Sequence, residues 1–157
     1  MTAPAPMFCV IADDEPRLRQ VLVRLMTGDG FTCFEAADGV EALEQLEKVP
    51  AALLLSDLRM PRMDGIELLR QSRAKYPDLA VILITAVADV ELALSCLANG
   101  AMDYLTKPFH LEEVLARVGQ AMEKRQLILE NRSYQTGLER LVATQARRLE
   151  ELFLGGV

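Results

Sequence analysis

Five short apolar runs alternate with segments in which apolar residues recur every three or four positions. Each run is too short to make a stable helix. The runs cover residues 7–12, 31–36, 51–56, 79–84 and 101–105. The third run contains three consecutive leucines, which indicates a strand that is buried on both faces. This alternation predicts an α/β fold in which a doubly wound parallel sheet carries helices on both faces.

Local signals mark where the helices between these runs begin and end. Pro16 suits the first position of a helix, where a backbone N–H is not needed. Asp38 followed by Glu41 predicts an N-terminal cap. Asn99 followed by Gly100 predicts the end of the fourth helix. These signals place one helix after each strand, as a parallel sheet requires.

Charged residues stand where several of the runs end. Asp13 and Asp14 follow the first run, Asp57 follows the third, and Lys107 follows the fifth. Right-handed crossovers leave two common strand orders, and the flavodoxin-like order 2-1-3-4-5 is one of them. In that order the first and third strands are neighbours, so the three carboxylates would meet where the direction of winding reverses. The sequence alone does not fix the order.

Composition narrows the class of protein. A chain of 157 residues, 51% hydrophobic and 25% charged, can form one domain with a core and a short appendage. The net charge of −6 disfavours a nucleic-acid surface, and no apolar run approaches the roughly 20 residues that span a bilayer. We expect a cytoplasmic protein without direct nucleic-acid or membrane contacts. Residues 1–6 lack the features of a signal peptide and are expected to be disordered.

Three carboxylates gathered at one point need a counter-charge. At separations of about 5 Å and an effective dielectric near 20, each pair repels by roughly 3 kcal/mol. One lysine does not neutralise the group, so either a carboxylate binds a proton or the group binds a divalent cation. An all-oxygen site suits Mg²⁺ better than zinc, because the chain has one histidine and no paired thiols. Mg²⁺ favours phosphoryl chemistry, in which an aspartate can be the nucleophile and form an aspartyl phosphate.

Taken together, these residues resemble the receiver domain of bacterial two-component response regulators, the CheY-like family. The resemblance covers residues 7–122. Each motif is weak alone, and the order and spacing of all of them make the signature specific. The motifs are Asp13-Asp14-Glu15-Pro16, Asp57 with Met60-Pro61 and Met63-Asp64-Gly65, Thr85-Ala86, and Lys107-Pro108-Phe109.

The resemblance implies how the acidic residues would act. Asp57 would accept a phosphoryl group from the phosphohistidine of a histidine kinase or phosphotransfer protein. Asp13, Asp14, Asp57 and the backbone carbonyl of Arg59 would bind the Mg²⁺ ion. In the resembled family the positions of Arg59 and Val87 tune the lifetime of the phosphoryl group. We expect slow loss of that group from this chain.

The resemblance also implies roles for residues on the fourth and fifth strands. Thr85 would donate its hydroxyl to a phosphoryl oxygen, and the small side chain of Ala86 would leave room for the group. Lys107 would pair with the phosphoryl group, and its bond to Pro108 is expected to be cis. Tyr104 matches the switch aromatic of the family, which turns inward as Thr85 moves.

Single residues of this set also have simpler explanations. Asp13 and Asp14 could merely cap the following helix. Thr85 could be an ordinary residue at a strand end, and Lys107 a solvated side chain. The joint occurrence of all the motifs in the right order favours the phosphoacceptor interpretation.

Residues 123–157 continue the chain beyond the resemblance. They contain no proline, and apolar residues recur partly in steps of three and four, interrupted by polar ones. The apolar residues are Ile128, Leu138, Val142, Leu149 and Leu152. We expect a helical or coiled-coil extension that forms a homodimer, or a linker to an output domain missing from this chain. The alternative is a helix that folds back on its own domain.

The leading interpretation is a phosphorylation-dependent switch that acts on no external substrate. It would signal through the face of the fourth helix, fifth strand and fifth helix, and through the extension. One alternative is a constitutive dimeric adaptor. Another is the front part of a longer regulator with an enzymatic output domain, such as a cyclic-di-GMP phosphodiesterase. A third is a Mg²⁺-dependent phosphatase, which usually carries a second aspartate at the position of Arg59.

Overall fold

The computed structural model describes residues 7–155, so the expected disorder of residues 1–6 lies outside the described part of the chain. The chain divides into two compact units, Met1–Glu123 and Lys124–Val157. One helix, α5, runs through the boundary between them.

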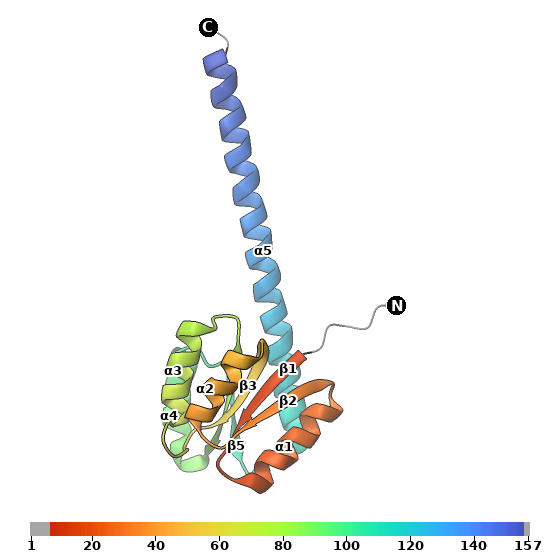
Figure 1. Ribbon diagram of the computed structural model, residues 1–157, viewed down its shortest axis with the longest axis vertical. Helices are drawn as coiled ribbons and strands as arrows, with labels where there is room; N and C mark the ends of the chain where they lie inside the picture. Colours follow the sequence, from red (N-terminus) through yellow and green to blue (C-terminus); the bar gives the residue numbers. More distant parts are fainter. Residues whose placement is uncertain (1–6, 156–157) are drawn as a thin grey trace. The chain divides into compact units, whose positions relative to one another are not determined.

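The first unit contains one five-stranded parallel sheet with the strand order β2-β1-β3-β4-β5 (Figure 1). The predicted α/β fold and its flavodoxin-like order are therefore confirmed. β1 and β3 are neighbours, and the chain reverses its direction of winding between them. The strands are β1 (Met7–Ala12), β2 (Phe31–Ala36), β3 (Ala51–Asp57), β4 (Ala80–Ala86) and β5 (Asp103–Lys107).

Helices cover both faces of this sheet, and each face has its own apolar core. The strand side chains that alternate along β1, β3 and β4 pack on one face against α1 and α5, and on the other against α2, α3 and α4. The helices are α1 (Pro16–Gly28), α2 (Gly39–Lys48), α3 (Gly65–Lys75), α4 (Val90–Ala98) and α5 (Leu111–Gly155), with a 3-10 turn η1 (Val87–Asp89) before α4.

The fifth strand begins two residues later than its apolar run. Gly100 follows the last turn of α4 with a φ of 110°, a left-handed conformation that favours glycine. The N–H of Gly100 donates to the carbonyl of Leu97, and the N–H of Ala101 donates to that of Cys96. This pattern is a Schellman motif, so Ala101 belongs to the end of the helix rather than to β5. The predicted C-cap pair is confirmed, and the apolar run overestimated the strand.

The loop between β3 and α3 is fixed by two glycines that allow close backbone contact. A Cβ atom on Gly65 would lie 2.4 Å from the backbone oxygen of Asp57, and one on Gly39 would lie 2.6 Å from that of Met63. The N–H of Gly65 donates to Leu58, and that of Gly39 donates to Met63. These contacts hold the loop that follows Asp57 against the ends of α2 and α3.

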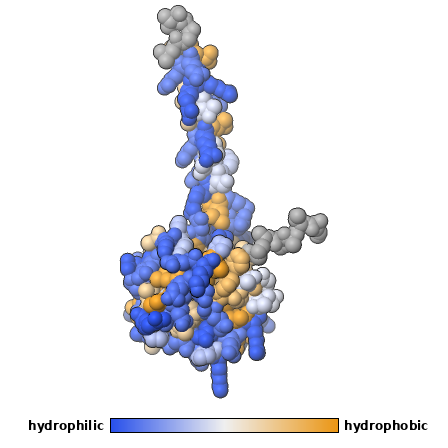
Figure 2. Space-filling view, viewed as in Figure 1, coloured by the Kyte–Doolittle hydropathy of each residue, from blue (hydrophilic) through white to orange (hydrophobic). Residues whose placement is uncertain are grey.

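The second unit is a single helical stretch. From Asn131 to Phe153 every described side chain is exposed, including Tyr134 at 66% and Phe153 at 83%. Hydrophobic side chains are interspersed with hydrophilic ones along this stretch (Figure 2). The helical extension that the sequence predicts is present. No helix among the described residues is long and apolar enough to cross a membrane.

Candidate functional site

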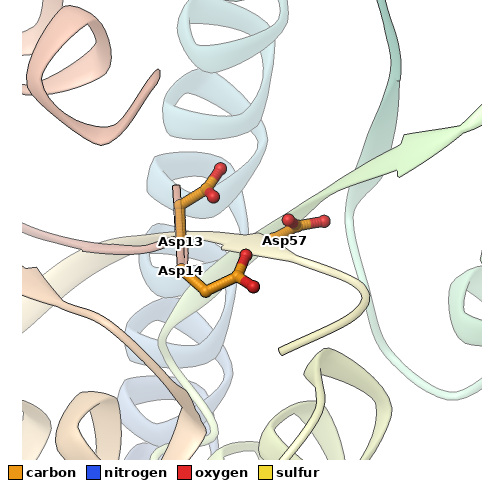
Figure 3. A group of neighbouring side chains, drawn as sticks. All are labelled: Asp13, Asp14 and Asp57. Carbon is orange, nitrogen blue, oxygen red and sulfur yellow. The ribbon is translucent and has the colours of Figure 1, made fainter. Parts of the chain in front are cut away.

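Three carboxylates meet where the sheet reverses its winding. Asp13 and Asp14 follow β1, Asp57 ends β3, and the pairing of Ala12 with Ser56 sets these ends side by side. One oxygen from each carboxylate lies within 4.8 Å of the others, and the three side chains converge (Figure 3). The structure thus brings together the three acidic residues that the sequence singled out.

Asp13 provides the most enclosed carboxylate of this cluster. Its side chain is fully buried, and its Oδ1 accepts a hydrogen bond from the N–H of Glu15 at 2.8 Å. Its Oδ2 is buried without any hydrogen-bond partner. The guanidinium of Arg19 donates to the backbone oxygen of Asp13 at 2.7 Å and so fixes the chain at this point. A buried carboxylate oxygen without a donor fits a site built to coordinate a hard cation.

The environment of Asp13 opposes its negative charge. Burial is the largest cause that raises the pKa of its carboxyl, the nearby Asp57 carboxylate adds to it, and the hydrogen bond from the Glu15 N–H opposes it; together these effects bring the pKa to about 6. A divalent cation between these carboxylates would reverse that effect, because it stabilises the ionised form. The electrostatics therefore agree with the donor geometry.

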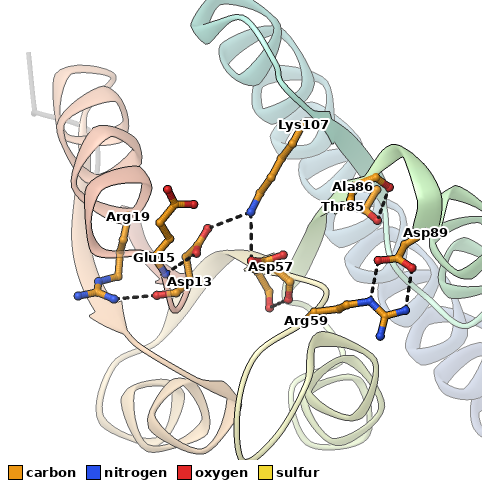
Figure 4. A network of polar contacts seen from close by, with 10 residues as sticks. Asp13, Glu15, Arg19, Asp57, Arg59, Thr85, Ala86, Asp89 and Lys107 are labelled. Atoms are coloured by element: carbon orange, nitrogen blue, oxygen red, sulfur yellow. Dashed lines mark hydrogen bonds and ion pairs between the residues drawn. The ribbon is translucent and has the colours of Figure 1, made fainter.

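Lys107 supplies the positive charge of the site from the end of β5. Its Nζ lies 3.1 Å from Oδ2 of Asp57 and 3.9 Å from Oδ2 of Asp13 (Figure 4). Burial acts to lower the pKa of Lys107, but the carboxylates of Asp57 and Asp13 outweigh it and raise that pKa. The ammonium group is therefore held charged beside Asp57. The peptide bond from Lys107 to Pro108 is cis.

The remaining sequence candidates lie on β4 and β5. Thr85 is buried, and its hydroxyl donates to the carbonyl of Ala86 at 3.2 Å. Ala86 is exposed at the end of β4. Tyr104 pairs with Leu83 in the sheet and packs, half buried, against the core on the side of α2, α3 and α4. Thr85 lies one strand away from Asp57, since β3 and β4 are neighbours.

One polar contact at this edge was not foreseen from the sequence. Arg59, two residues after Asp57, donates from Nε and Nη2 to the two carboxylate oxygens of Asp89, each at 2.7 Å (Figure 4). The two residues are 30 positions apart. No local pattern in the sequence could have linked Asp89 to Arg59, because the pairing depends on how two loops meet.

Comparison with known proteins agrees with this geometry. The model of the response regulator receiver domain family matches residues 9–119. The DNA-binding transcriptional regulator NtrC of Escherichia coli is 44% identical over 112 residues, which are 71% of this chain and 24% of that protein. The C4-dicarboxylate transport transcriptional regulatory protein DctD of Rhizobium meliloti is 37% identical over 139 residues, which are 88% of this chain and 30% of that protein.

Solved structures give the same result. A response regulator receiver domain protein from Clostridium thermocellum superposes with a TM-score of 0.74 at 25% identity, over 78% of this chain and 98% of its own. NtrX from Brucella abortus superposes with a TM-score of 0.78 at 25% identity, over 83% of this chain and 30% of its own. The chain belongs to the response regulator receiver domain family. It spans about a quarter of the length of the curated relatives first matched.

Membership of this family means that the protein takes part in phosphorylation-dependent signalling in a two-component system. The receiver is a regulatory rather than an enzymatic domain, and its acidic cluster can bind a metal ion. The resemblance found in the motifs is thereby confirmed.

Proposed function

We propose that Asp57 is the phosphoacceptor of this receiver and that its modification is the switching event. The observation that carries the proposal is the convergence on Asp57 of two further carboxylates and the ammonium group of Lys107, at 3.1 Å. The phosphohistidine of a histidine kinase or phosphotransfer protein would be the donor. A carboxylate oxygen of Asp57 attacks phosphorus, and the bond from phosphorus to the histidine nitrogen breaks.

Asp13, Asp14, Asp57 and the backbone carbonyl of Arg59 would hold Mg²⁺ at this site. When bound, the ion supplies positive charge for the phosphoryl oxygens and for the clustered carboxylates. The buried Oδ2 of Asp13, which has no hydrogen-bond partner, supports this assignment. Asp57 is largely buried, and the 11% of its side chain that stays exposed is where the donor would approach.

Lys107 and Thr85 would stabilise the modified state. Lys107 already donates to Oδ2 of Asp57 and would keep contact with a phosphoryl oxygen. The hydroxyl of Thr85, which now donates to the carbonyl of Ala86, would donate to a phosphoryl oxygen instead. Because Ala86 ends the strand with a small side chain, the phosphoryl group has room beside it. Tyr104, half buried on the neighbouring strand, would turn inward as Thr85 moves.

The modified state would be passed on through the face of α4, β5 and α5 and through the extension. The exposed apolar residues of the extension support self-association, because a helix with such a stripe gains stability by burying it against a partner. We propose a homodimer through residues 124–155. The imperfect heptad, with Asn131, Gln135 and Gln145 in the stripe, would make this pairing weak enough to respond to phosphorylation.

The curated relatives indicate the class of output. NtrC and DctD are named as transcriptional regulators, and both are several times longer than their matched part. The match to DctD covers more of this chain than its first unit contains, so it includes part of the extension. We propose that this receiver controls transcription through further domains rather than through its own contact with nucleic acid. The relatives give less support to a cyclic-di-GMP phosphodiesterase output.

The mass of the intact protein tests the central proposal. Incubation with acetyl phosphate and Mg²⁺ should add one phosphoryl group to the wild type and none to Asp57→Asn. Removal of Mg²⁺ should abolish the reaction. An equal adduct on Asp57→Asn would place the phosphoacceptor elsewhere, and no adduct on the wild type would support a constitutive adaptor instead. Repeated turnover of a small phosphate ester would support the phosphatase alternative.

Light scattering tests the proposed dimer. The wild type should gain mass with beryllofluoride, a phosphoryl mimic, and a chain ending at Glu123 should not. A molecular mass that is independent of beryllofluoride would separate self-association from the switch.

A further inference from the structure

The bidentate pair of Arg59 and Asp89 joins the two loops that flank Asp57. Arg59 stands in the loop between β3 and α3, and Asp89 is the last residue of η1, directly before α4. The carboxylate of Asp89 is 14% exposed, whereas the side chain of Arg59 is 70% exposed. Asp89 is therefore the more enclosed member of the pair, and the guanidinium lies over it at the start of α4.

This pair differs from an ordinary surface ion pair. Most exposed pairs contribute little, because two long side chains are ordered in a medium of high dielectric. Here both donors of a planar fork meet both oxygens of one carboxylate, which is the favourable geometry for arginine. Interaction with Asp89 raises the pKa of Arg59, and Arg59 lowers the pKa of Asp89, so both groups stay charged.

The loop after Asp57 is held from two sides. At its far end, Nε of Arg62 donates to Asp38 at 2.7 Å, which ties the loop to the cap of α2. At its near end, Arg59 ties it to the start of α4. Only the near anchor lies beside the phosphoacceptor, two positions away along the chain. The two anchors therefore respond differently to a new charge on Asp57.

A phosphoryl group on Asp57 would be a second acceptor for Arg59. It carries up to two negative charges and three oxygens, and guanidinium groups bind such oxygens in the bidentate geometry now used for Asp89. We propose that Asp89 is a positioning residue, which holds Arg59 in the unmodified protein and yields it to the phosphoryl group on Asp57. The proposal rests on the proposed function of Asp57.

The transfer of Arg59 from Asp89 to the phosphoryl group would have two consequences. Hydrolysis requires water to attack phosphorus while the bond to the Asp57 oxygen breaks, which releases inorganic phosphate and restores the carboxylate. Arg59 across the phosphoryl oxygens hinders that water, so Asp89 shortens the phosphoryl lifetime by competing for Arg59. In addition, α4 loses its bridge to the β3–α3 loop whenever Arg59 leaves Asp89. The first effect alters kinetics, and the second alters the start of a signalling helix.

Decay of the phosphorylated protein, followed by intact mass after removal of acetyl phosphate, tests the competition. Asp89→Asn should lengthen the lifetime roughly two- to fivefold, the range expected for the loss of an exposed ion pair. Arg59→Gln should shorten it, and Asp89→Asn should have no further effect in that background. Asp89→Glu keeps a carboxylate that can pair with Arg59, so its phosphoryl lifetime should stay close to that of the wild type. Glu47→Gln, which breaks an ion pair with Lys75 between α2 and α3 that lies away from Asp57, should change nothing.

Amide hydrogen exchange gives a second readout that does not depend on decay. Exchange at residues 87–92 should accelerate when the wild type is phosphorylated, and it should already be fast in unmodified Asp89→Asn. The proposal is overturned if the lifetimes of wild type and Asp89→Asn agree, or if Asp89→Asn acts equally in the Arg59→Gln background. Absence of any phosphoryl adduct on the wild type would overturn the proposed function of Asp57, and with it the proposed transfer of Arg59 from Asp89.

Discussion

Both units of this chain contain helices with regularly spaced apolar residues, but the two units differ in whether these residues are buried. In the first unit the apolar positions of the helices are buried against the sheet, as Leu22 of α1 and Val114 of α5 show with no exposed surface. In the second unit α5 continues with apolar residues at similar spacing, yet Leu141 and Leu149 remain 55% and 61% exposed. The apolar periodicity therefore predicts a helix in both units, but the apolar side chains form a core only in the first unit.

The difference shows where the stability of the chain resides. Burial of a leucine side chain contributes about 1.5–3 kcal/mol, and the first unit has many such side chains on both faces of its sheet. An isolated helix gains little beyond its own hydrogen bonds and is marginal in water. We therefore expect the extension to be only marginally stable without a partner, whereas the receiver has a core of its own.

Truncation of one leucine in each unit should separate the two units most strongly. Leu54→Ala removes a fully buried side chain from the centre of β3 and should lower the free energy of unfolding by about 2–5 kcal/mol. Leu141→Ala in the extension should change it by less than about 0.5 kcal/mol. Urea unfolding followed by circular dichroism measures both. A large cost for Leu141→Ala would show that the extension is part of the folded core.

Two glycine substitutions, one in each unit, should have opposite effects on stability. Gly65→Ala places a Cβ atom 2.4 Å from the backbone oxygen of Asp57, so it should cost about 1–3 kcal/mol and slow phosphorylation by displacing the acceptor. Gly137→Ala meets no atom within 4 Å and should stabilise the extension helix by roughly 1 kcal/mol. Thermal unfolding and helical content report the two effects. Stabilisation by Gly65→Ala would contradict the close approach.

Asp13→Asn removes the negative charge of this buried side chain while keeping nearly its shape, so it measures the electrostatic cost of burying that charge. Since the folded-state pKa of Asp13 is raised to about 6, the folded protein binds the proton more tightly than the unfolded chain does. In Mg²⁺-free buffer the contribution of Asp13 to the stability of the wild type should therefore grow as pH falls from about 7 to 4. The variant should lack this contribution and be about 1–3 kcal/mol more stable than the wild type at pH 7, but not at pH 4.

Magnesium provides the control for that experiment. Added Mg²⁺ should raise the unfolding temperature of the wild type at pH 7, because it stabilises the ionised carboxylates. It should raise that of Asp13→Asn much less. Equal stability of the two proteins at pH 7 without Mg²⁺ would mean that burial of Asp13 carries no electrostatic cost.

Local chemistry made most of the first unit predictable. The cap formed by Asp38, whose side chain accepts from the N–H of Glu41 at 2.9 Å, was expected from two residues three positions apart. Short apolar runs gave the strands, and β1 and β2 have the predicted bounds. The strand order could be narrowed but not fixed, since it depends on contacts between distant segments. The acidic cluster followed once that order was known.

Contacts between loops could not be predicted in the same way. Arg59 and Asp89 carry complementary charges, but the chain has many such pairs, and nothing local selects this one. The role of Gly65 in admitting the backbone of Asp57 was likewise visible only as part of a motif. In the extension, the sequence predicts a helix with exposed apolar residues but does not define what would cover them. The spacing of apolar residues predicts that a helix forms, but it does not predict which segments the helix packs against.

The smallest expected effect is that of removing the extension altogether. A chain ending at Glu123 keeps the α5 residues that pack on the sheet, Val114, Val118 and Ala121. Its receiver should therefore unfold within about 0.5 kcal/mol of the full chain at low protein concentration, where the extension has no partner. Chemical denaturation at several concentrations tests this. If the full chain becomes more stable than the truncated one as concentration rises, the gain measures pairing between extensions, because a monomeric helix cannot produce a concentration dependence.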